Sequence, residues 1–361
     1  MRRRRFLAMC AVGAVSTLRW TRPGQAQTSR VEVVATGLDT PWAAAFAPDG
    51  RIFLTERPGR IRVIQDGRLR REPVSALPVT SQGESGLMGL ALDPAFPTNG
   101  FLYVCYTYSG PDGLRNRVAR LVERDGTARQ DRILLENIPG AWIHDGGRLK
   151  FGPDGKLYVT TGDAANPPIA QDLRSLGGKI LRLNPDGSIP LDNPFSGSPV
   201  WTLGHRNPQG LAWHPVTGQL FATEHGTSVH DEVNIIQSGK NYGWPTVIGP
   251  ARDPRFVDPI LTFTPNIAPS GAAFAGRRYP HWEGNLLFAT LRGRHLHRLV
   301  LAPPDYTRVL SHERLFDDAF GRLRDIVEAP DGRLYLLTNN RDGRGIPVPD
   351  DDKLLRIVPP L

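Results

Sequence analysis

One hairpin pattern occurs six times along this chain. Each copy has a glycine turn followed by a short run of apolar and β-branched residues, and a second short apolar run lies just ahead of the turn. Consecutive turn glycines are 48 to 66 residues apart, so six such units account for nearly the whole sequence. Strand-rich repeats of about this length are typical of β-propeller blades, and the sequence therefore predicts an all-β fold with six blades. The turn glycines are Gly50, Gly100, Gly155, Gly218, Gly284 and Gly332.

The two ends of the repeated region predict how the ring closes. A lone apolar run at 31–37 precedes the first repeat, and another at 353–359 follows the last. Pairing of these terminal strands within one blade would close the ring and cover both of their edges. A two-sheet sandwich, the alternative all-β architecture, would not show the same hairpin six times at this interval. We therefore expect one six-bladed domain over 27–361.

Residues 1–26 have the features of an export signal. Four arginines precede a short apolar stretch, and the small-x-small pattern "GQA" ends at Ala26. The motif "RRRFL" also fits the twin-arginine type of signal, so the route of export stays open. The apolar stretch is too short to span a bilayer. The sequence therefore predicts a periplasmic or secreted protein without a membrane span.

The charge balance argues against a nucleic-acid-binding protein, and the cysteine count argues against a fold held together by disulfides. Of the 44 lysines and arginines, six lie in residues 1–26, which leaves 38 basic against 36 acidic residues. Removal of residues 1–26 therefore lowers the formal charge from +8 to +2, and nucleic-acid binding loses its main support. Beyond the signal the only cysteine is Cys105, so no intrachain disulfide can form, and we expect Cys105 inside a buried strand.

Repeat position predicts which polar residues meet in space. In a propeller the first strand of each blade lines the central channel, and the second strand runs back antiparallel to it. The loop that leads into the first strand and the loop that leaves the second therefore open on the same face, at one mouth of the channel. The residues at these positions are Glu84, Ser85, His144, Asp145, Asp163, Arg206, Asn207, Gln209, Glu224, His225, Gly226, Ser270, Arg292, Arg322 and Arg324.

The chemistry of this set points to an anionic ligand. Guanidinium groups that converge from several blades repel one another unless an anion lies among them, and their planar donors suit carboxylates. His144 is the natural proton acceptor, because imidazole titrates near neutral pH, and Asp163 could orient it or hold Arg206. The sequence has no dinucleotide fingerprint, phosphate loop, GxSxG elbow or HExxH motif. A dinucleotide cofactor held in the usual way is therefore not expected.

Several longer motifs carry a resemblance to a known family. They include "GHRNPQGLAWHP" at 204–215, "DEVNIIQSGKNYGWP" at 231–245 and "HDGGRLKFGPDGKLYVTTGD" at 144–163. On these motifs the chain resembles the soluble PQQ-dependent aldose sugar dehydrogenases, the glucose/sorbosone dehydrogenase family. The resemblance implies a six-bladed propeller that binds pyrroloquinoline quinone (PQQ) and calcium in its axial funnel. It also implies oxidation of the C1 hydroxyl of an aldose to the lactone, with hydride transfer to PQQ.

The same resemblance assigns roles to individual residues. His144 is similar to the catalytic base, and Arg206 to the group that stabilises negative charge on the quinone oxygen. Asp163 corresponds to the carboxylate that orients the His144/Arg206 pair. Glu84 stands where some members have glutamine, and Arg292 where a lysine is common; we expect Glu84 to be protonated or bound to an arginine or a cation. The implied cofactor contacts are Glu84, Arg206, Asn207, Gln209, Arg292, Arg322 and Arg324.

Calcium enters by resemblance only. Gly226 and Thr227 correspond to backbone-carbonyl donors for the calcium that chelates PQQ, although the family usually has glycine-proline there. Glu232 and Tyr242 match a second, structural calcium site of some members. A tyrosine that some relatives place against PQQ shortly after "NYGWP" is absent here.

Two other functions stay open at this stage. The first is a calcium-dependent lactonase or related hydrolase on a six-bladed scaffold, which would need several side-chain oxygens around an axial metal. The second is a non-catalytic ligand-binding propeller, which would not need His144 beside Arg206. The sequence also leaves open the preferred sugar, the electron acceptor, the choice between monomer and dimer, and occupancy of the second calcium site.

Overall fold

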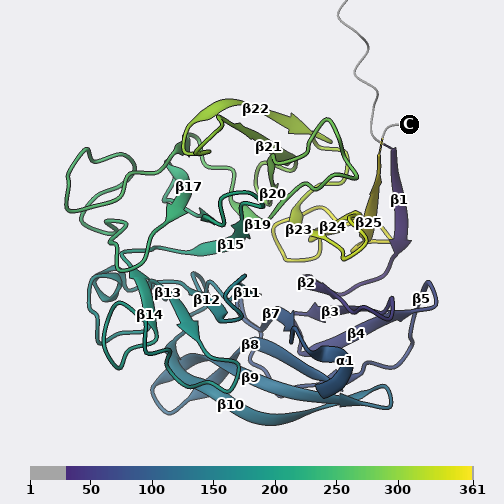
Figure 1. Cartoon of the computed structure of the whole chain (residues 1–361). Coiled ribbons are helices and arrows are strands. Elements are labelled where there is room, and N and C mark those ends of the chain that lie inside the picture. The colour runs from purple at the N-terminus through teal and green to yellow at the C-terminus, as the bar shows by residue number, and fades with distance from the viewer. Residues whose placement is uncertain (1–29, 360–361) are drawn as a thin grey trace, which may run out of the picture.

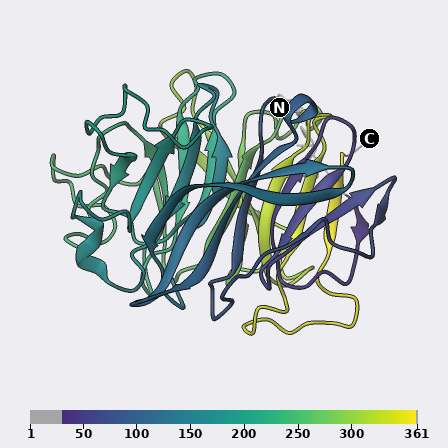
Figure 2. The same cartoon turned by 90° about the horizontal axis from the view of Figure 1, so that it is seen from below.

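The structure, a computed structural model of the chain, describes residues 30–359 and shows six antiparallel sheets arranged around a central axis (Figure 1). Seen from the side, the strands run between the two faces of the disc (Figure 2). The predicted all-β, six-bladed propeller is therefore confirmed. The predicted export signal at 1–26 lies outside the described residues. Within 30–359 no helix is long and apolar enough to cross a bilayer.

Each blade is a sheet of four main strands, which are given below in order from the axis outward. Blade 1 contains β2 (Pro41–Phe46), β3 (Ile52–Glu56), β4 (Arg60–Gln65) and β5 (Arg68–Leu69), with β6 (Ser75–Ala76) paired to β4. Blade 2 contains β7 (Leu87–Leu92), β8 (Phe101–Gly110), β9 (Gly113–Arg124) and β10 (Thr127–Pro139), with the short helix α1 (Phe96–Asn99) between β7 and β8. Blade 3 contains β11 (Leu149–Phe151), β12 (Leu157–Thr161), β13 (Lys179–Leu183) and β14 (Val200–Leu203), with the 3-10 helix η1 (Pro167–Ala170) between β12 and β13.

The other three blades repeat this arrangement. Blade 4 contains β15 (Pro208–Trp213), β16 (Leu220–Glu224), β17 (Asp231–Ile236) and β18 (Leu261–Phe263). Blade 5 contains β19 (Pro269–Phe274), β20 (Leu286–Thr290), β21 (Leu296–Leu301) and β22 (Val309–Leu315). Blade 6 contains β23 (Leu323–Glu328), β24 (Leu334–Thr338), β25 (Leu354–Val358) and β1 (Arg30–Ala35).

The repeated hairpin of the sequence is the inner pair of strands of each blade. All six turn glycines have a positive φ, between 66° and 89°, which glycine adopts without steric cost. The second strands are buried at every position in five of the six blades, because each is covered by the neighbouring blades on both faces. A strand buried on both faces has a continuous apolar sequence, and this is why the repeats are visible as short apolar runs.

The ring closes by pairing of the two chain ends. Strand β1 pairs antiparallel with β25, from Arg30 opposite Val358 to Ala35 opposite Leu354. Glu32 and Arg356 form an ion pair across the two strands. The predicted closure is therefore observed, and blade 6 is built from both ends of the described chain.

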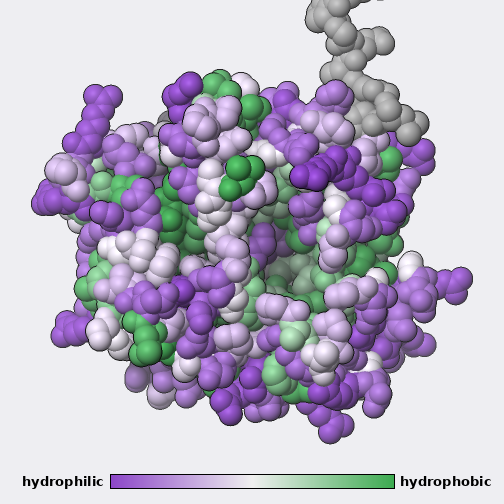
Figure 3. Space-filling model, viewed as in Figure 1, coloured by the Kyte–Doolittle hydropathy of each residue, from purple (hydrophilic) through white to green (hydrophobic). Residues whose placement is uncertain are grey.

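The apolar core lies between adjacent blades rather than at the axis. It forms five clusters of buried side chains, each contributed by two or three consecutive blades. Cys105 belongs to one of them, in β8, with a side chain that is 1% exposed and has no disulfide partner among the described residues. The inner strands themselves surround a channel, and the molecule is hollowed where the blades meet (Figure 3).

A layer of side chains from four blades divides this channel. The ring of Trp42, from blade 1, lies 4.2 Å from the guanidinium carbon of Arg148 and 5.5 Å from that of Arg324. Arg148 donates from NH1 to Asp325 (2.8 Å) and from Nε to the carbonyl of Gln209 (2.8 Å). One cavity lies on each side of this layer. The mouth cavity is lined by the loops that carry His144 and Arg206, and the second cavity is called the closed-end cavity here because Arg148 and Asp325 of the layer form part of its wall.

Candidate functional site

The mouth cavity is the candidate functional site. Its volume is about 410 Å³, and its walls come from five of the six blades. Its lining residues lie on loops ahead of inner strands or after second strands, which are the positions that repeat geometry predicts. They are Glu84, His144, Arg206, His225, Gly226, Thr227, Asn266, Ala268, Leu291, Arg292, Arg322 and Arg344.

His144 is held as a base by a carboxylate. Its Nδ1 lies 2.8 Å from Oδ1 of Asp163, and because a carboxylate only accepts, Nδ1 carries the proton and Nε2 keeps its lone pair. The His144 backbone has φ of +61°, a conformation that is uncommon for a residue with a side chain. The His144 backbone packs closely against Gly162. A side chain at position 162 would prevent this contact, since a Cβ there would lie 1.8 Å from the His144 carbonyl oxygen.

Asp163 connects His144 to the opposite side of the site through a tryptophan. The carboxylate is fully buried, accepts from His144 through Oδ1, and accepts from Nε1 of Trp244 through Oδ2 (2.9 Å). The Trp244 ring in turn lies 5.4 Å from the guanidinium carbon of Arg206. We expected Asp163 to orient both His144 and Arg206, but within 30–359 it forms no ion pair with Arg206. Asp163 instead donates its backbone N–H to the Arg206 carbonyl (2.8 Å), and Trp244, a residue of the "NYGWP" motif, lies between the two side chains.

A buried acid fixes the backbone of Arg206. Glu224 accepts from the Arg206 backbone N–H through one oxygen and from Nδ1 of His205 through the other (2.8 Å). Nε2 of His205 then accepts from the Thr202 hydroxyl (2.9 Å), and its ring stacks on Tyr242 at 4.6 Å. His205 is fully buried, so in "GHRNPQG" it supports the site from behind while Arg206 lines the cavity.

The Arg206 side chain faces backbone carbonyls. NH1 donates to the carbonyl of Gly226 and, at 3.3 Å, to that of His225. Its buried Nε has no partner among the described residues, and burial is the main reason that the pKa of Arg206 is lowered. A cation with an unused donor beside a polar cavity is suited to an anionic ligand.

The other three arginines that the sequence predicts for the site lie at two depths in the channel. At the cavity wall Arg292 donates to the side-chain oxygen of Asn266, and Arg322 binds Asp342 through Nε (3.0 Å) and NH2 (2.7 Å). Arg324 is 3% exposed and lies deeper, where NH1 donates to Oε1 of Gln209 (2.7 Å). Burial lowers the pKa of Arg324 to about 9.

Glu84 is neutralised by an arginine that the sequence reasoning missed. Arg344 donates from NH1 to one Glu84 oxygen (2.6 Å), and the His144 backbone N–H donates to the other (3.1 Å). Burial alone would raise the pKa of Glu84, but His225, Arg344 and that N–H lower it to about 2. Because His225 is itself neutral above about pH 3, Arg344 is the partner that acts at neutral pH. Of the expected alternatives, Glu84 is therefore bound to an arginine.

His225 offers a hydrogen-bond donor to the cavity. Its Nδ1 accepts from the side-chain amide of Asn207 (3.4 Å), whose oxygen is engaged by the Gly146 backbone N–H (3.0 Å). The neutral ring therefore carries its proton on Nε2, which is buried and has no partner among residues 30–359. Burial lowers the pKa of His225 to about 3, so the ring is a neutral donor at physiological pH.

Two predicted quinone contacts are not in the cavity wall. The Asn207 side chain is fully buried and caps the Gly146 N–H, and Gln209 is 3% exposed and accepts from Arg324. Both amides satisfy buried donors behind the wall, where an unpaired donor would be costly. In this arrangement neither side chain lines the mouth cavity, and direct contact of Asn207 and Gln209 with the ligand stays a prediction.

The four predicted metal ligands fall into two separate places. Gly226 and Thr227 line the mouth cavity, where their carbonyl oxygens accept from Arg206 and from the Asn266 amide (2.8 Å), respectively. Glu232 and Tyr242 line a neighbouring cavity of about 20 Å³, the size of one water or ion. Burial and the nearby Glu224 carboxylate raise the pKa of Glu232 to about 8.

Repeat position in the sequence could have identified two further arginines near the mouth. Arg344 and Arg57 both follow the second strand of a blade, blade 6 and blade 1, and repeat position alone places them at the mouth. The Nε of Arg57 is buried and has no partner in the part of the chain that the structure describes, and burial lowers the pKa of Arg57. Trp244 has no such signal, because a long loop between β17 and β18 brings it back to the mouth.

Comparison with known proteins agrees with this geometry. The family model described as glucose/sorbosone dehydrogenase matches residues 38–355. The aldose sugar dehydrogenase of Escherichia coli is 33% identical, with 95% of this chain and 98% of that protein covered. Quinoprotein glucose dehydrogenase B of Acinetobacter calcoaceticus is 30% identical over 85% of each chain. The PQQ-bound aldose sugar dehydrogenase of Streptomyces coelicolor superposes with a TM-score of 0.83 at 37% identity, covering 92% of this chain and 98% of that one. The chain therefore belongs to the glucose/sorbosone dehydrogenase family of oxidoreductases.

Proposed function

We propose that the protein is a PQQ-dependent dehydrogenase that oxidises the C1 hydroxyl of an aldose to the lactone. One observation carries the proposal: a histidine with a free Nε2 lone pair, oriented by Asp163, shares a cavity with four arginines, and Nε of one of them, Arg206, has no partner within residues 30–359. A base beside cationic groups is what removal of a proton and a hydride from an alcohol requires.

The residues of the mouth cavity fit PQQ, which carries several carboxylates and quinone oxygens. Nε of Arg206 and Nε2 of His225 are buried donors that lack an acceptor within residues 30–359. Arg292 has no carboxylate partner among the described residues, and Arg322 adds a second guanidinium at the wall. A volume of about 410 Å³ is within the range of pockets for organic cofactors. Arg206, Arg292 and Arg322 would hold the anion, with Arg324 adding positive charge from below.

The chain supplies the proton chemistry of the reaction. Nε2 of His144 accepts the proton of the C1 hydroxyl, and the Asp163 carboxylate stabilises the imidazolium that forms. When bound, PQQ supplies the acceptor for the hydride that leaves C1 as the carbonyl of the lactone forms. The positive charge of Arg206 stabilises negative charge that develops at the acceptor oxygen. The ion pair with Arg344 keeps Glu84 from repelling an anionic ligand.

The proposal also includes calcium, for which the chain offers two places. The carbonyl oxygens of Gly226 and Thr227 are suitable ligands, but Arg206 must first release the Gly226 carbonyl. A rotation of the Arg206 side chain that frees this carbonyl would also direct the guanidinium to another acceptor. At the second place the buried Glu224 and the half-buried Glu232 face a space of ion size beside Tyr242, and a divalent cation there would favour the ionised form of Glu232, whose pKa is raised.

The alternatives of the sequence analysis gain little from the geometry. A lactonase would need free side-chain oxygens at an axial metal, whereas Glu84 is bound to Arg344 and Asp163 to His144 and Trp244. A binding propeller would not need the oriented base. A periplasmic or secreted location, an unidentified electron acceptor and a monomeric or dimeric state stay predictions.

The test is reconstitution with PQQ and calcium. We expect a visible absorbance from bound PQQ and, on addition of aldoses, reduction of a redox dye that depends on PQQ. A panel of aldoses with and without PQQ would establish the preferred sugar. Lactone hydrolysis without quinone would support the lactonase instead, and PQQ binding without dye reduction on any aldose would refute the proposed reaction.

A further inference from the structure

Trp142 is the exposed aromatic residue at the mouth. Its side chain is 59% exposed, although tryptophan is normally buried over most of its surface. It lies two residues before His144, and its carbonyl accepts from the Glu84 backbone N–H (2.8 Å). Both His144 and Glu84 line the mouth cavity, so Trp142 is at the rim of that cavity.

The loop that carries Trp142 is held on two sides. The Ala141 N–H donates to Oδ1 of the buried Asp145 (3.0 Å), which also accepts from the Asn116 amide (2.9 Å). On the other side the tryptophan packs on Gly83. A Cβ at Gly83 would lie 2.2 Å from the Trp142 carbonyl oxygen and 3.3 Å from ring carbon Cε3. The ring is therefore positioned before any ligand arrives, which reduces the entropy cost of binding.

The other described tryptophans differ from Trp142 in one respect. Each stacks on or packs edge-on against another aromatic ring or a guanidinium, as Trp42 does with Arg148 and Trp282 does with Tyr279. The same holds for Trp201, Trp213 and Trp244. For the Trp142 ring, neither such a contact nor a hydrogen bond from its indole N–H is found in the described part of the chain.

We propose that Trp142 is a stacking platform for the ring of the sugar substrate. A pyranose presents C–H groups on its faces and hydroxyls on its edge. The C–H groups are attracted to the negative face of an indole ring, and the edge hydroxyls stay free for Glu84 and Arg344. Two residues of backbone span at most about 7 Å, so the ring of a sugar whose C1 hydroxyl reaches His144 is within reach of Trp142. The proposal rests on the proposed function and adds a residue that selects ring-form sugars.

The kinetic test compares W142A with W142F and with L191A. Leu191 is fully exposed in the segment between β13 and β14, remote from the mouth-lining loops, and serves as the matched surface control. We expect W142A to raise KM for glucose about 3- to 10-fold with kcat within twofold, and W142F to recover most of the loss. L191A and the PQQ affinity of all variants should be unchanged. An unchanged KM in W142A would overturn the proposal.

A binding measurement separates this proposal from the proposed reaction. The probe is 1,5-anhydroglucitol, which has the pyranose ring but no C1 hydroxyl and cannot be oxidised there. Calorimetry on the PQQ-loaded protein should show Kd about 3- to 10-fold weaker for W142A than for wild type. If wild type oxidises no aldose, the proposed reaction fails, yet weaker analogue binding by W142A still supports the stacking role. If wild type oxidises aldoses and Kd is equal in both proteins, the stacking role is refuted alone.

Discussion

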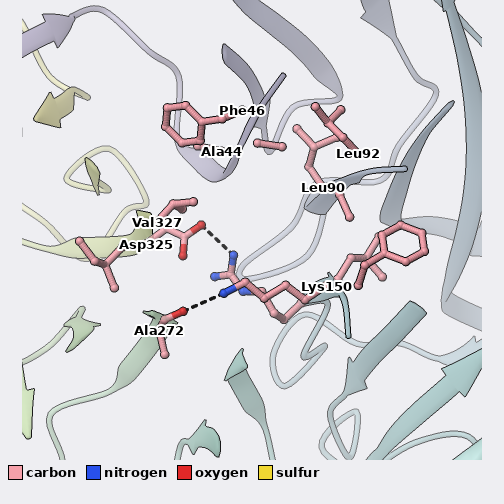
Figure 4. A pocket seen from close by; sticks show the side chains of 14 residues that line it. Ala44, Phe46, Leu90, Leu92, Lys150, Ala272, Asp325 and Val327 are labelled. Atoms are coloured by element: carbon pink, nitrogen blue, oxygen red, sulfur yellow. Dashed lines mark hydrogen bonds and ion pairs between the residues drawn. The ribbon is translucent and has the colours of Figure 1, made fainter. Parts of the chain in front are cut away.

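The two ends of the channel are built from the same six blades but have opposite chemistry. The mouth cavity is lined by loop residues, with arginines from three blades and few apolar side chains. The closed-end cavity, of about 210 Å³, is lined by the inner strands, and its wall is largely apolar, with Ala44, Phe46, Leu90 and Leu92 on one side (Figure 4).

Charges at the closed end are engaged by the protein itself. Arg148 pairs with Asp325, and Nζ of Lys150 donates to the carbonyl of Leu211 at 3.0 Å. Nζ of Lys150 also donates to the carbonyl of Ala272 at 3.0 Å (Figure 4). Burial lowers the pKa of Lys150 to about 8. Among the described residues, NH2 of Arg148 has no partner at the closed end, although this guanidinium keeps its Asp325 counter-charge. At the mouth, Nε of Arg206 and Nε2 of His225 also have no partner there, and neither side chain forms an ion pair within residues 30–359. Strands fix their side chains against one another, whereas loops leave polar groups free for a ligand.

The largest effect on the mouth is expected from His144→Ala. Removal of the base should lower kcat for dye reduction by about 10²- to 10⁴-fold, because proton removal from C1–OH loses its acceptor. The arginines are untouched, so PQQ affinity should change little. Steady-state kinetics and a PQQ titration on the same preparation check both parts. Near-native turnover in this variant would show that another group is the base.

The corresponding change at the closed end should affect stability instead. Asp325→Asn leaves the buried Arg148 without its counter-charge and should lower the free energy of unfolding by about 3 to 5 kcal/mol. Denaturant unfolding measures this loss, and PQQ affinity should be retained. The double variant Arg148→Met/Asp325→Leu, which replaces both charges by apolar groups, is the control and should regain much of the stability. A loss of PQQ binding without a loss of stability in Asp325→Asn would remove the distinction between the two ends.

The difference between the ends also explains what the sequence could predict. The blades follow from local rules, since a turn glycine and a doubly buried strand are visible in any single repeat. The loop residues could be placed at one mouth, because repeat position fixes the face on which a loop opens. Side-chain direction could not be predicted: Asn207 and Gln209 turn toward Gly146 and Arg324, which are distant in sequence.

Long loops set a second limit. Arg344 reaches Glu84 across 260 positions of sequence, and Trp244 reaches Asp163 from a loop between the outer strands of blade 4. A loop path has no periodicity from which such a contact could be inferred. The closed-end cavity was missed for a related reason, since its walls are ordinary strand residues whose sequence shows only burial.

Arg322→Ala should have an intermediate effect on the mouth. The variant removes a guanidinium from the wall and leaves the Asp342 carboxylate, 3% exposed, facing an anionic ligand. PQQ affinity should fall about 10- to 100-fold, with a smaller change in kcat at saturating PQQ. The double variant Arg322→Ala/Asp342→Asn should recover part of the affinity by removing the carboxylate charge. Equal PQQ affinity in wild type and Arg322→Ala, measured by titration, would contradict the placement of the cofactor carboxylates.

The smallest effect is expected from the ion pair at the rim. Because the pKa of Glu84 is held at about 2, below its ordinary value of 4.5, the pair stabilises the folded chain above about pH 4.5, and this contribution is lost as the pH falls toward 2. Arg344→Ala leaves a carboxylate beside the ligand and should weaken PQQ binding about 3- to 10-fold at pH 7. Glu84→Gln in the same background should restore the affinity.

The pH dependence of Arg344→Ala provides the internal check. Without Arg344, burial raises the pKa of Glu84, so this carboxyl becomes protonated at a higher pH than in wild type. The affinity of the variant for PQQ, relative to wild type, should therefore recover as the pH is lowered from 7 toward 4, while wild type itself keeps Glu84 ionised over that range. A ratio that stays constant with pH would mean that Arg344 binds the ligand directly, and the mouth would then contain a fourth guanidinium for the anion rather than a neutralised acid.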